Sequence, residues 1–257
     1  MDALFADCLN RMDRWFRRLE TAVPRPIQIP YLHHFVFRYA EKTLEQALVM
    51  KLARVVTGLH SARILLNHGF LQEQAAIHRM LDEFQQDITF LSMARFDDDF
   101  TELHEGYLSC FYEEEFDKPE DPVASIQKRP SIPRQKIHAY LARKEADIGI
   151  PDPSRGQELT RTLSKAYSGF VHGASTQILN MYGGNPPRFQ ISGILGASHE
   201  LDHRRDLWNY FYRGILSFNE IGLVLNVSEV AAEAHAYAVS FAQAIGKNYS
   251  QRAQNET

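Results

Sequence analysis

The stretch LSKAYSGFVHGASTQ, residues Leu163–Gln177, predicts the organisation of the chain. At 100° per residue, the sequence around it forms a helix over 159–182 with apolar residues on one side. The other side carries polar side chains at helical spacing, with Gly169 and Gly173 beside them: Ser164, Ser168, His172 and Ser175. A glycine costs about 1 kcal/mol relative to alanine inside a helix, so two of them indicate that another group approaches this backbone closely. A second helix and a ligand are the two candidates.

Length and composition are those of one globular domain, residues 1–257. Of the 257 residues, 44% are hydrophobic and 23% are charged, and the formal net charge is −4. This charge excludes a global attraction to nucleic acid but leaves room for a local basic patch. Cys8 and Cys110 are the cysteines. Such a pair excludes a disulfide framework and favours a reducing, cytoplasmic location. No apolar run approaches the roughly 18 residues of a membrane-spanning helix.

Apolar residues recur at helical spacing along most of the chain, which predicts an all-α fold. We expect a multi-helix bundle with long antiparallel helical hairpins and at most one short β-hairpin. Besides 159–182, the expected helices are 2–22, 41–68 (with a start near Tyr31 as the alternative), 70–94, 97–116, 135–147, 198–226 and 228–248. Gly69 separates 41–68 from 70–94, so these two are expected to be antiparallel neighbours with Leu65 and Phe84 buried.

Two further segments are interpreted from their composition. The N-terminal helix 2–22 is expected to lie at the periphery of the domain. The connection 118–134 is proline-rich and basic, and it is too long for a simple loop. We interpret it as a strap or as the lid of an active site.

The expected helix 70–94 carries two pairs of polar residues at one-turn spacing. Arg79 precedes Glu83, and His78 precedes Asp82. The Arg79–Glu83 pair lies opposite the apolar stripe, which favours a solvated ion pair worth roughly a few tenths of a kcal/mol. Small residues border the same side, so a second helix that covers the pair is the alternative.

Two stretches together resemble a bacterial all-helical family of unknown function. They are GFLQEQAAIHRMLDEF, Gly69–Phe84, and AYSGFVHGAS, Ala166–Ser175. That family pairs a G-x-x-x-x-A-x-x-x-x-R-x-x-x-E helix with a later S-x-x-x-H or Y-S-x-x-x-H helix. The first pattern fits loosely here, with Gly69, Gln74–Ala75, Arg79 and Glu83, and the second is met by Tyr167, Ser168 and His172. The family is similar in turn to the HEPN superfamily of helical bundles, many members of which are ribonucleases in toxin and antiphage systems.

The resemblance implies an RNA- or nucleotide-directed protein with His172, Ser168, Arg79, Glu83 and Tyr167 as its site residues. HEPN ribonucleases carry an arginine that stabilises phosphate charge and a histidine that transfers protons, separated by four to six residues. In this sequence Tyr167 occupies the arginine position relative to His172. Arg161 lies roughly 16 Å from His172 along a helix axis, which is too far to serve the same phosphate.

A HEPN-like protein with this departure is either a binder without that chemistry or one that takes an arginine from a neighbouring helix. We hypothesise that Ser168 and His172 meet Arg79 and Glu83 in one polar cluster, because buried polar groups must satisfy one another. In the alternative interpretation, His172 is a structural histidine that is hydrogen-bonded in a helix interface.

A competing pattern is HELDH, His199–His203, which satisfies H-E-x-x-H. On a helix, His199 and His203 share a face and could bind zinc, with Glu200 as the general base. However, Asp202 and Arg204 are charged where zinc proteases carry uncharged or apolar residues, and no third ligand is evident. We therefore predict that no metal binds here.

Three functional hypotheses follow. The first is a bacterial, cytosolic, HEPN-like component of a toxin or antiphage defence system, directed at RNA or a nucleotide and a ribonuclease if it is catalytic. The second is a non-enzymatic helical interaction module. The third is a metallohydrolase that uses the H-E-x-x-H pattern. We expect no cofactor and no membrane partner, and we expect a homodimer that forms through the helices.

Overall fold

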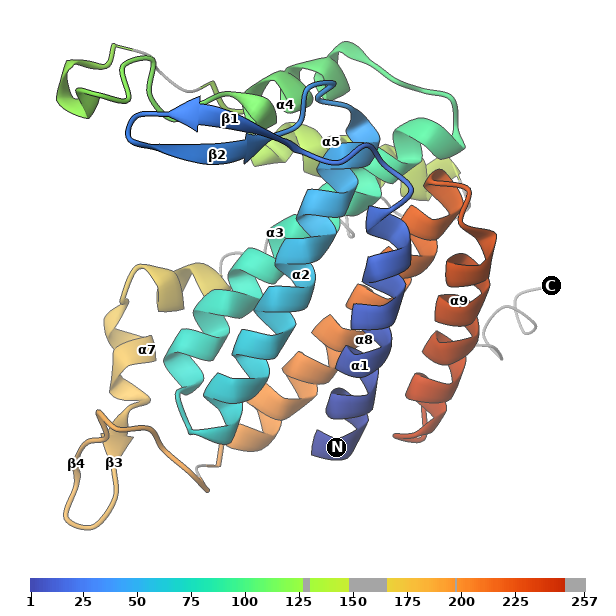
Figure 1. The fold of residues 1–257 in the computed structure, drawn as a ribbon. Coiled ribbons are helices and arrows are strands. Elements are labelled where there is room, and N and C mark those ends of the chain that lie inside the picture. Colours follow the sequence, from blue (N-terminus) through green and yellow to red (C-terminus); the bar gives the residue numbers. More distant parts are fainter. Residues whose placement is uncertain (127–129, 148–165, 197, 248–257) are drawn as a thin grey trace.

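The computed structural model of the chain describes residues 1–126, 130–147, 166–196 and 198–247. Most of these residues are helical, and their strands form two small antiparallel hairpins (Figure 1). The expectation of a mostly helical chain is therefore confirmed. No helix in these ranges is long and apolar enough to cross a lipid bilayer.

The elements follow one another along the chain with short connections between most of them. The long helices are α1 (Asp2–Glu20), α2 (Leu44–Asn67), α3 (Leu71–Phe96), α8 (Glu200–Val224) and α9 (Ser228–Gln243). The shorter ones are α4 (Glu102–Tyr112), α5 (Arg134–Asp147), α7 (Ser175–Leu179) and the 3₁₀ turn Pro122–Ala124. The strands are β1 (Ile27–Tyr31), β2 (His34–Arg38), β3 (Tyr182–Gly183) and β4 (Arg188–Phe189).

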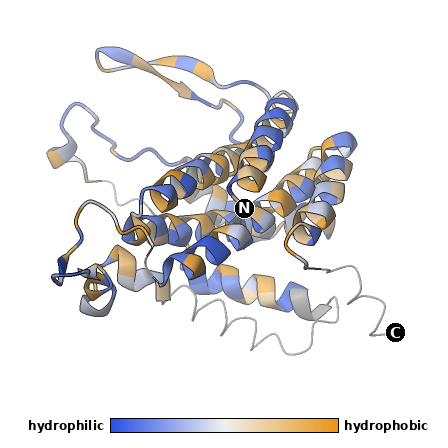
Figure 2. Ribbon diagram, turned by 90° about the horizontal axis from the view of Figure 1, so that it is seen from below, coloured by the Kyte–Doolittle hydropathy of each residue, from blue (hydrophilic) through white to orange (hydrophobic). Residues whose placement is uncertain are grey.

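The hairpin of β1 and β2 was not predicted. Its register pairs Ile27 with Arg38 and Tyr31 with His34, and it stands away from the helices (Figures 1 and 2). With β3 and β4 the described chain has two hairpins, so the expectation of at most one was wrong. The physical reason is the aromatic and β-branched composition of 27–38, which favours extended backbone. The start of α2 is set instead by Thr43, whose side chain accepts from the Gln46 backbone N–H in a capping box.

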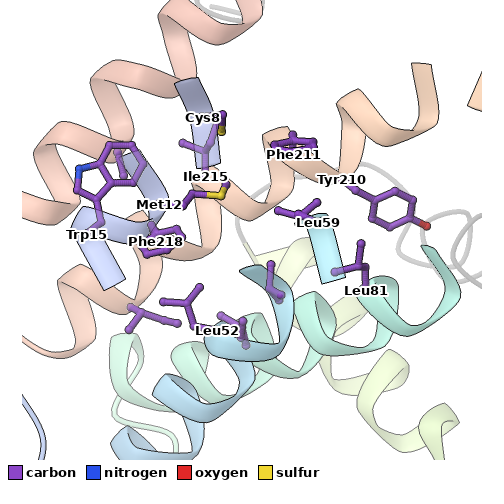
Figure 3. Packing of buried hydrophobic residues seen from close by; sticks show 14 of the residues in the cluster. Cys8, Met12, Trp15, Leu52, Leu59, Leu81, Tyr210, Phe211, Ile215 and Phe218 are labelled. Atoms are coloured by element: carbon purple, nitrogen blue, oxygen red, sulfur yellow. The ribbon is translucent and has the colours of Figure 1, made fainter. Parts of the chain in front are cut away.

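The hydrophobic core lies where α1, α2, α3, α8 and α9 face one another (Figures 1 and 3). Phe5 of α1 stacks on Phe211 of α8 with ring centroids 4.5 Å apart, and Met12 and Trp15 are buried beside Phe218. The first helix therefore lies in the core, and the expectation that it is peripheral was wrong. Its apolar stripe covers a groove that α2 and α8 form together.

Gly214 allows α8 to approach α1 and α2 closely. A Cβ atom at this position would lie 3.0 Å from Leu59 Cδ1 and 3.1 Å from Met12 Cε. Real Cβ atoms rarely have such short contacts in well-packed interiors. This glycine is thus a packing requirement at the centre of the core.

Helices α2 and α3 lie side by side (Figure 1). Glu45 pairs with Arg95 and Lys51 with Asp87, so residue numbers rise along α2 as they fall along α3. Leu65 and Phe84 are half-buried rather than buried, so that detail of the expectation was wrong. Residues of α3 other than Phe84 fill the centre of the contact with α2, such as Leu81 against Gly58.

The expected helix over 159–182 is interrupted in the structure. Residues 166–171 are helical, a turn follows at His172 and Gly173, and α7 begins at Ser175; residues 159–165 lie outside the described ranges. Gly173 has φ +64°, and the Ala174 N–H donates to the Gly169 carbonyl at 2.9 Å. This left-handed glycine ends the helix as C-terminal glycines do. The expected core stripe is lost beyond it, since Ile178 is 41% exposed.

We expect Gly214→Val to destabilise the fold by about 1–3 kcal/mol, because the added carbons meet packed side chains on two sides. Urea unfolding followed by circular dichroism measures this change. Ala232→Val, at an exposed position of α9, is the matched control and should change the free energy of unfolding by about 0.5 kcal/mol or less. Equal effects at the two positions would contradict the close approach.

Candidate functional site

One face of α3 is polar although it is buried. Gln74, His78, Asp82 and Gln86 recur every four residues, and each is at most 8% exposed. A spacing of four residues places them along one line of the helix. We call this line the polar face of α3, and it lies toward α8 and α5.

A chain of hydrogen bonds joins α8, α3 and α5 across this face. Arg213 Nη1 donates to Asp82 Oδ1 at 2.8 Å, and Gln86 Nε2 donates to Asp82 Oδ2 at 2.7 Å. Because a carboxylate only accepts, the second contact fixes the orientation of the Gln86 amide. The amide oxygen then lies 2.9 Å from Arg134 Nη2 and 2.8 Å from His138 Nε2. An amide oxygen also only accepts, so Nε2 of His138 carries the proton and Nδ1 has the lone pair of the neutral ring.

Arg134 is the first residue of α5, and several groups hold its guanidinium. Nη1 pairs with Asp87, whose other oxygen accepts from Lys51 at 2.8 Å. Nη2 also donates to the Glu83 carbonyl at 3.3 Å. Its Nε is buried and has no hydrogen-bond partner within the described ranges. One buried donor of Arg134 is therefore left unpaired among the described residues.

The charges of this region are layered from the interior outwards. The side chains of Asp82 and Asp87 are 6% and 5% exposed, whereas those of Arg213 and Arg134 are 36% and 26% exposed. Arg79 adds a third arginine and pairs with Glu83 at 2.6 Å. We call Arg79, Arg134, Arg213 and His138 the arginine cluster. Asp82 and Asp87 are buried beneath Arg213 and Arg134, whereas Arg79 is 22% exposed and its partner Glu83 is 38% exposed.

The surroundings of His138 shift the pKa of its imidazole. Burial lowers the pKa of its imidazole, and the positive charges of Arg134 and Arg79 lower it further, against the opposing effects of Asp82 and Glu83. A histidine with a lowered pKa is neutral at pH 7. A neutral imidazole with an available lone pair can accept a proton, which is what a general base requires.

A group of aromatic rings adjoins the cluster at the N-terminal part of the polar face. The His78 ring stacks on Tyr210 at 4.5 Å and meets the edge of Tyr167 at 5.8 Å. The Tyr167 hydroxyl donates to Asp206 at 2.8 Å. Figure 3 shows Tyr210 at the margin of the core, with its hydroxyl directed away from Phe211. Burial lowers the pKa of His78 to about 3, so its ring is neutral.

The structure separates the site residues that the sequence predicts. Arg79 and Glu83 form the expected ion pair beside Arg134, and Tyr167 packs against the polar face of α3. Ser168 and His172 have no described hydrogen bond or ion pair with Arg79 or Glu83, and His172 is exposed. The described residues therefore show no contact that joins Ser168, His172, Arg79 and Glu83 in one cluster. The physical reason is the turn at Gly173, which directs this end of the segment into solvent.

The H-E-x-x-H residues are occupied by other contacts. Glu200 accepts from Arg204 at 3.0 Å and from the Gly196 backbone N–H at 2.8 Å. His203 Nδ1 lies 2.9 Å from the Gln74 side-chain oxygen. Among the described residues, no three His, Cys, Asp or Glu side chains are placed to hold a metal ion. Whether a metal binds stays a matter of prediction.

The residues that complete the arginine cluster were not predicted from the sequence. Arg134 was assigned to the basic connection 118–134, and His138 lies one turn further along α5. Their spacing was a usable signal, because residues four apart share a helix face. Arg213 gave no such signal, since only the packing of α8 on α3 brings it to Asp82.

Comparisons with known proteins add no relative. No protein-family model matches the chain, no curated protein matches it, and no solved structure matches it.

We expect Arg213→Met to destabilise the fold by about 3 kcal/mol, because it leaves the Asp82 carboxylate buried with one partner fewer. Chemical unfolding at pH 7 measures the change. Arg205→Met is the control on the same helix, since Arg205 and Asp202 are 66% and 72% exposed. It should cost at most about 1 kcal/mol. A cost for Arg213→Met no larger than that of the control would show that Asp82 does not depend on Arg213.

A pH-dependent contribution to stability is expected from Glu220. Thr89 Oγ1 donates to its carboxyl group at 3.1 Å, and burial raises the pKa to about 7. The folded protein therefore holds this proton more tightly than the unfolded chain does. From pH about 4.5 to about 7, the contribution of Glu220 to the free energy of unfolding should fall by at most about 3 kcal/mol.

Glu220→Gln should remove this contribution, so the stability difference between variant and wild type should shift in favour of the variant as pH rises. Thermal unfolding of both proteins from pH 4.5 to 8 measures this stability difference. The histidines titrate alike in both proteins, so their effect on stability cancels in the difference. A difference that does not change with pH would contradict a buried, protonated Glu220.

Proposed function

We propose that the protein is directed at RNA or a nucleotide, that it acts as a ribonuclease, and that the arginine cluster binds the phosphate. The observation that carries the proposal is the meeting of Arg134 and His138 on the Gln86 amide, with an unpaired Arg134 Nε and two further arginines nearby. Arginine is suited to phosphate because its planar donors match phosphate oxygens. A neutral histidine next to it supplies a proton acceptor.

The reaction that suits this set of groups is cleavage by the RNA's own 2′-hydroxyl. His138 Nδ1 removes the proton of the 2′-hydroxyl, and the oxygen attacks the adjacent phosphorus. The arginines stabilise the negative charge that develops on the phosphate oxygens. The bond to the 5′-oxygen breaks, and the proton returns to that oxygen from His138. The products are a 2′,3′-cyclic phosphate and a 5′-hydroxyl.

The resemblance to HEPN proteins supports this chemistry. The residues that we assign to it differ from those that the sequence pattern suggests. Arg134 and His138 form an arginine–histidine pair on one helix, with three residues between them rather than four to six. Arg79 and Glu83 are retained beside them, while His172 and Ser168 are not part of the site. We extend the proposal to a bacterial, cytosolic toxin or defence component and to a homodimer that forms through the helices.

A second candidate is a non-enzymatic interaction module. Each carboxylate at the cluster is paired with a cation, which is also what a purely structural network requires. The β1–β2 hairpin favours this candidate too, because Phe35 and Phe37 are 55% and 59% exposed and lie 5.9 Å apart. Exposed aromatic side chains of this kind are enriched at protein interfaces.

An assay with end-labelled single-stranded RNA separates the two candidates. We expect the full-length chain to cleave the RNA in EDTA, and His138→Ala to reduce the rate by about 10²–10⁴-fold. His235→Ala, at an exposed position of α9, is the control and should retain the wild-type rate. Circular dichroism checks that each variant is folded.

Other outcomes of the assay count against the proposal. Loss of cleavage in His172→Ala but not in His138→Ala would restore the site that the sequence pattern suggests. Activity that EDTA abolishes, that zinc restores and that His203→Ala lacks would favour the metallohydrolase. No cleavage and no RNA binding by the wild type would leave the interaction module.

A further inference from the structure

Two side chains of the polar face of α3 lack the partners that their burial demands. Gln74 and His78 are both 0% exposed. Among the residues that the structure describes, the Gln74 Nε2 and both ring nitrogens of His78 have no hydrogen-bond partner. A buried polar group that stays unpaired costs about 1–3 kcal/mol, so an apolar residue would be more stable at position 78. Unsatisfied groups of this kind call for a functional explanation.

These unpaired groups point to a ligand that differs from phosphate. Their neighbours are the rings of Tyr167 and Tyr210, and Gln74 itself contacts His203. Burial and the nearby His199 lower the pKa of His203, so its ring is neutral at pH 7. A flat, uncharged ring with donors and acceptors in its plane fits such a site. Nucleobases have that chemistry, and proteins commonly recognise them by stacking and edge hydrogen bonds.

The position along α3 relates this region to the arginine cluster. His78 and Asp82 are four residues apart, which is about 6 Å along the helix axis. One turn thus separates the neutral, aromatic end of the polar face from the end that the arginines surround. A nucleotide has the same division into a flat, uncharged base and a charged phosphate.

The Tyr167 ring occupies the place beside His78. It meets the His78 and Tyr210 rings edge-on, at 5.8 Å and 6.2 Å. The helical residues 166–171 that carry it are attached to α8 by the Tyr167–Asp206 hydrogen bond and by the contact of Phe170 with His203 at 6.1 Å. Another flat ring that replaces Tyr167 must break the hydrogen bond to Asp206.

We propose that Gln74 and His78 form a nucleobase subsite, which a base enters by replacing the Tyr167 ring. The Gln74 amide and the His78 nitrogens bond the edge of the base, which lies beside Tyr210 where the Tyr167 ring was. This inference rests on the proposed function, because it assigns the base end of a nucleotide whose phosphate lies at the arginine cluster. Gln74 and His78 are then specificity-determining residues of that site.

The test measures binding of the four nucleosides, the four 5′-monophosphates and ribose 5-phosphate to the full chain by calorimetry. We expect at least one monophosphate to bind more than tenfold more tightly than ribose 5-phosphate. His78→Phe and Gln74→Leu should reduce nucleoside and nucleotide affinity at least tenfold and leave ribose 5-phosphate binding unchanged. The melting temperature should be equal or higher in His78→Phe, whereas Gln74→Leu also loses the contact with His203. His138→Ala should leave nucleoside binding unchanged.

Tyr167→Ala provides a measurement that does not depend on mutating the subsite itself. Removing the ring should raise nucleoside affinity at least tenfold, because the base no longer has to displace it. A purely structural Tyr167 would only lower the melting temperature.

The outcomes separate this inference from the proposed function. Equal affinity for nucleotides and ribose 5-phosphate, or variants that melt higher with unchanged nucleotide affinity, would overturn the subsite. Nucleoside binding that His78→Phe abolishes would support the subsite even where RNA cleavage and ribose 5-phosphate binding are absent. In that case the proposed role of the arginine cluster as a phosphate site would be refuted, and the nucleobase subsite would stand.

Discussion

The interaction on which the rest of the structure depends is the pairing of Asp82 with Arg213 and Gln86. A carboxylate inside a helical bundle is stable only when cations or donors replace the water it has lost. Arg213 comes from α8, and Gln86 passes the contact on to Arg134 and His138 of α5. One buried charge thus constrains how both helices lie on α3.

Helix α3 therefore serves two different environments. Toward α2 it packs closely, as the contact of Leu81 with Gly58 shows, and Asp87 and Arg95 add ion pairs to Lys51 and Glu45. Toward α5 and α8 it carries the polar face, with paired groups around Asp82 and unpaired ones at Gln74 and His78. A helix buried on both sides usually has little polar surface. The unpaired groups reduce stability, which proteins tolerate mainly at functional sites.

The proposed chemistry depends on this arrangement more than on any sequence motif. The arginine–histidine pair of HEPN ribonucleases is a local motif, whereas the cluster here draws Arg79, Arg134 and Arg213 from three helices. Such convergence lets several cations face one phosphate while their carboxylate partners hold them in place. The same pairing also gives a structural network, so activity and binding measurements must decide between the two functions.

By itself, the sequence determined the helical class, the approximate bounds of most helices and the Arg79–Glu83 pair. These features depend on local periodicity and on contacts one turn apart. The sequence could not reveal the β1–β2 hairpin. The turn between the two strands has no Gly, Asn or Asp, so a helix that starts near Tyr31 remained an alternative. The sequence also could not show that Gly173 ends the predicted central helix and leaves His172 exposed. Only the tertiary structure brought Arg213 and His138 to the Asp82–Gln86 turn, since the packing of separate helices, and not sequence spacing, sets those distances.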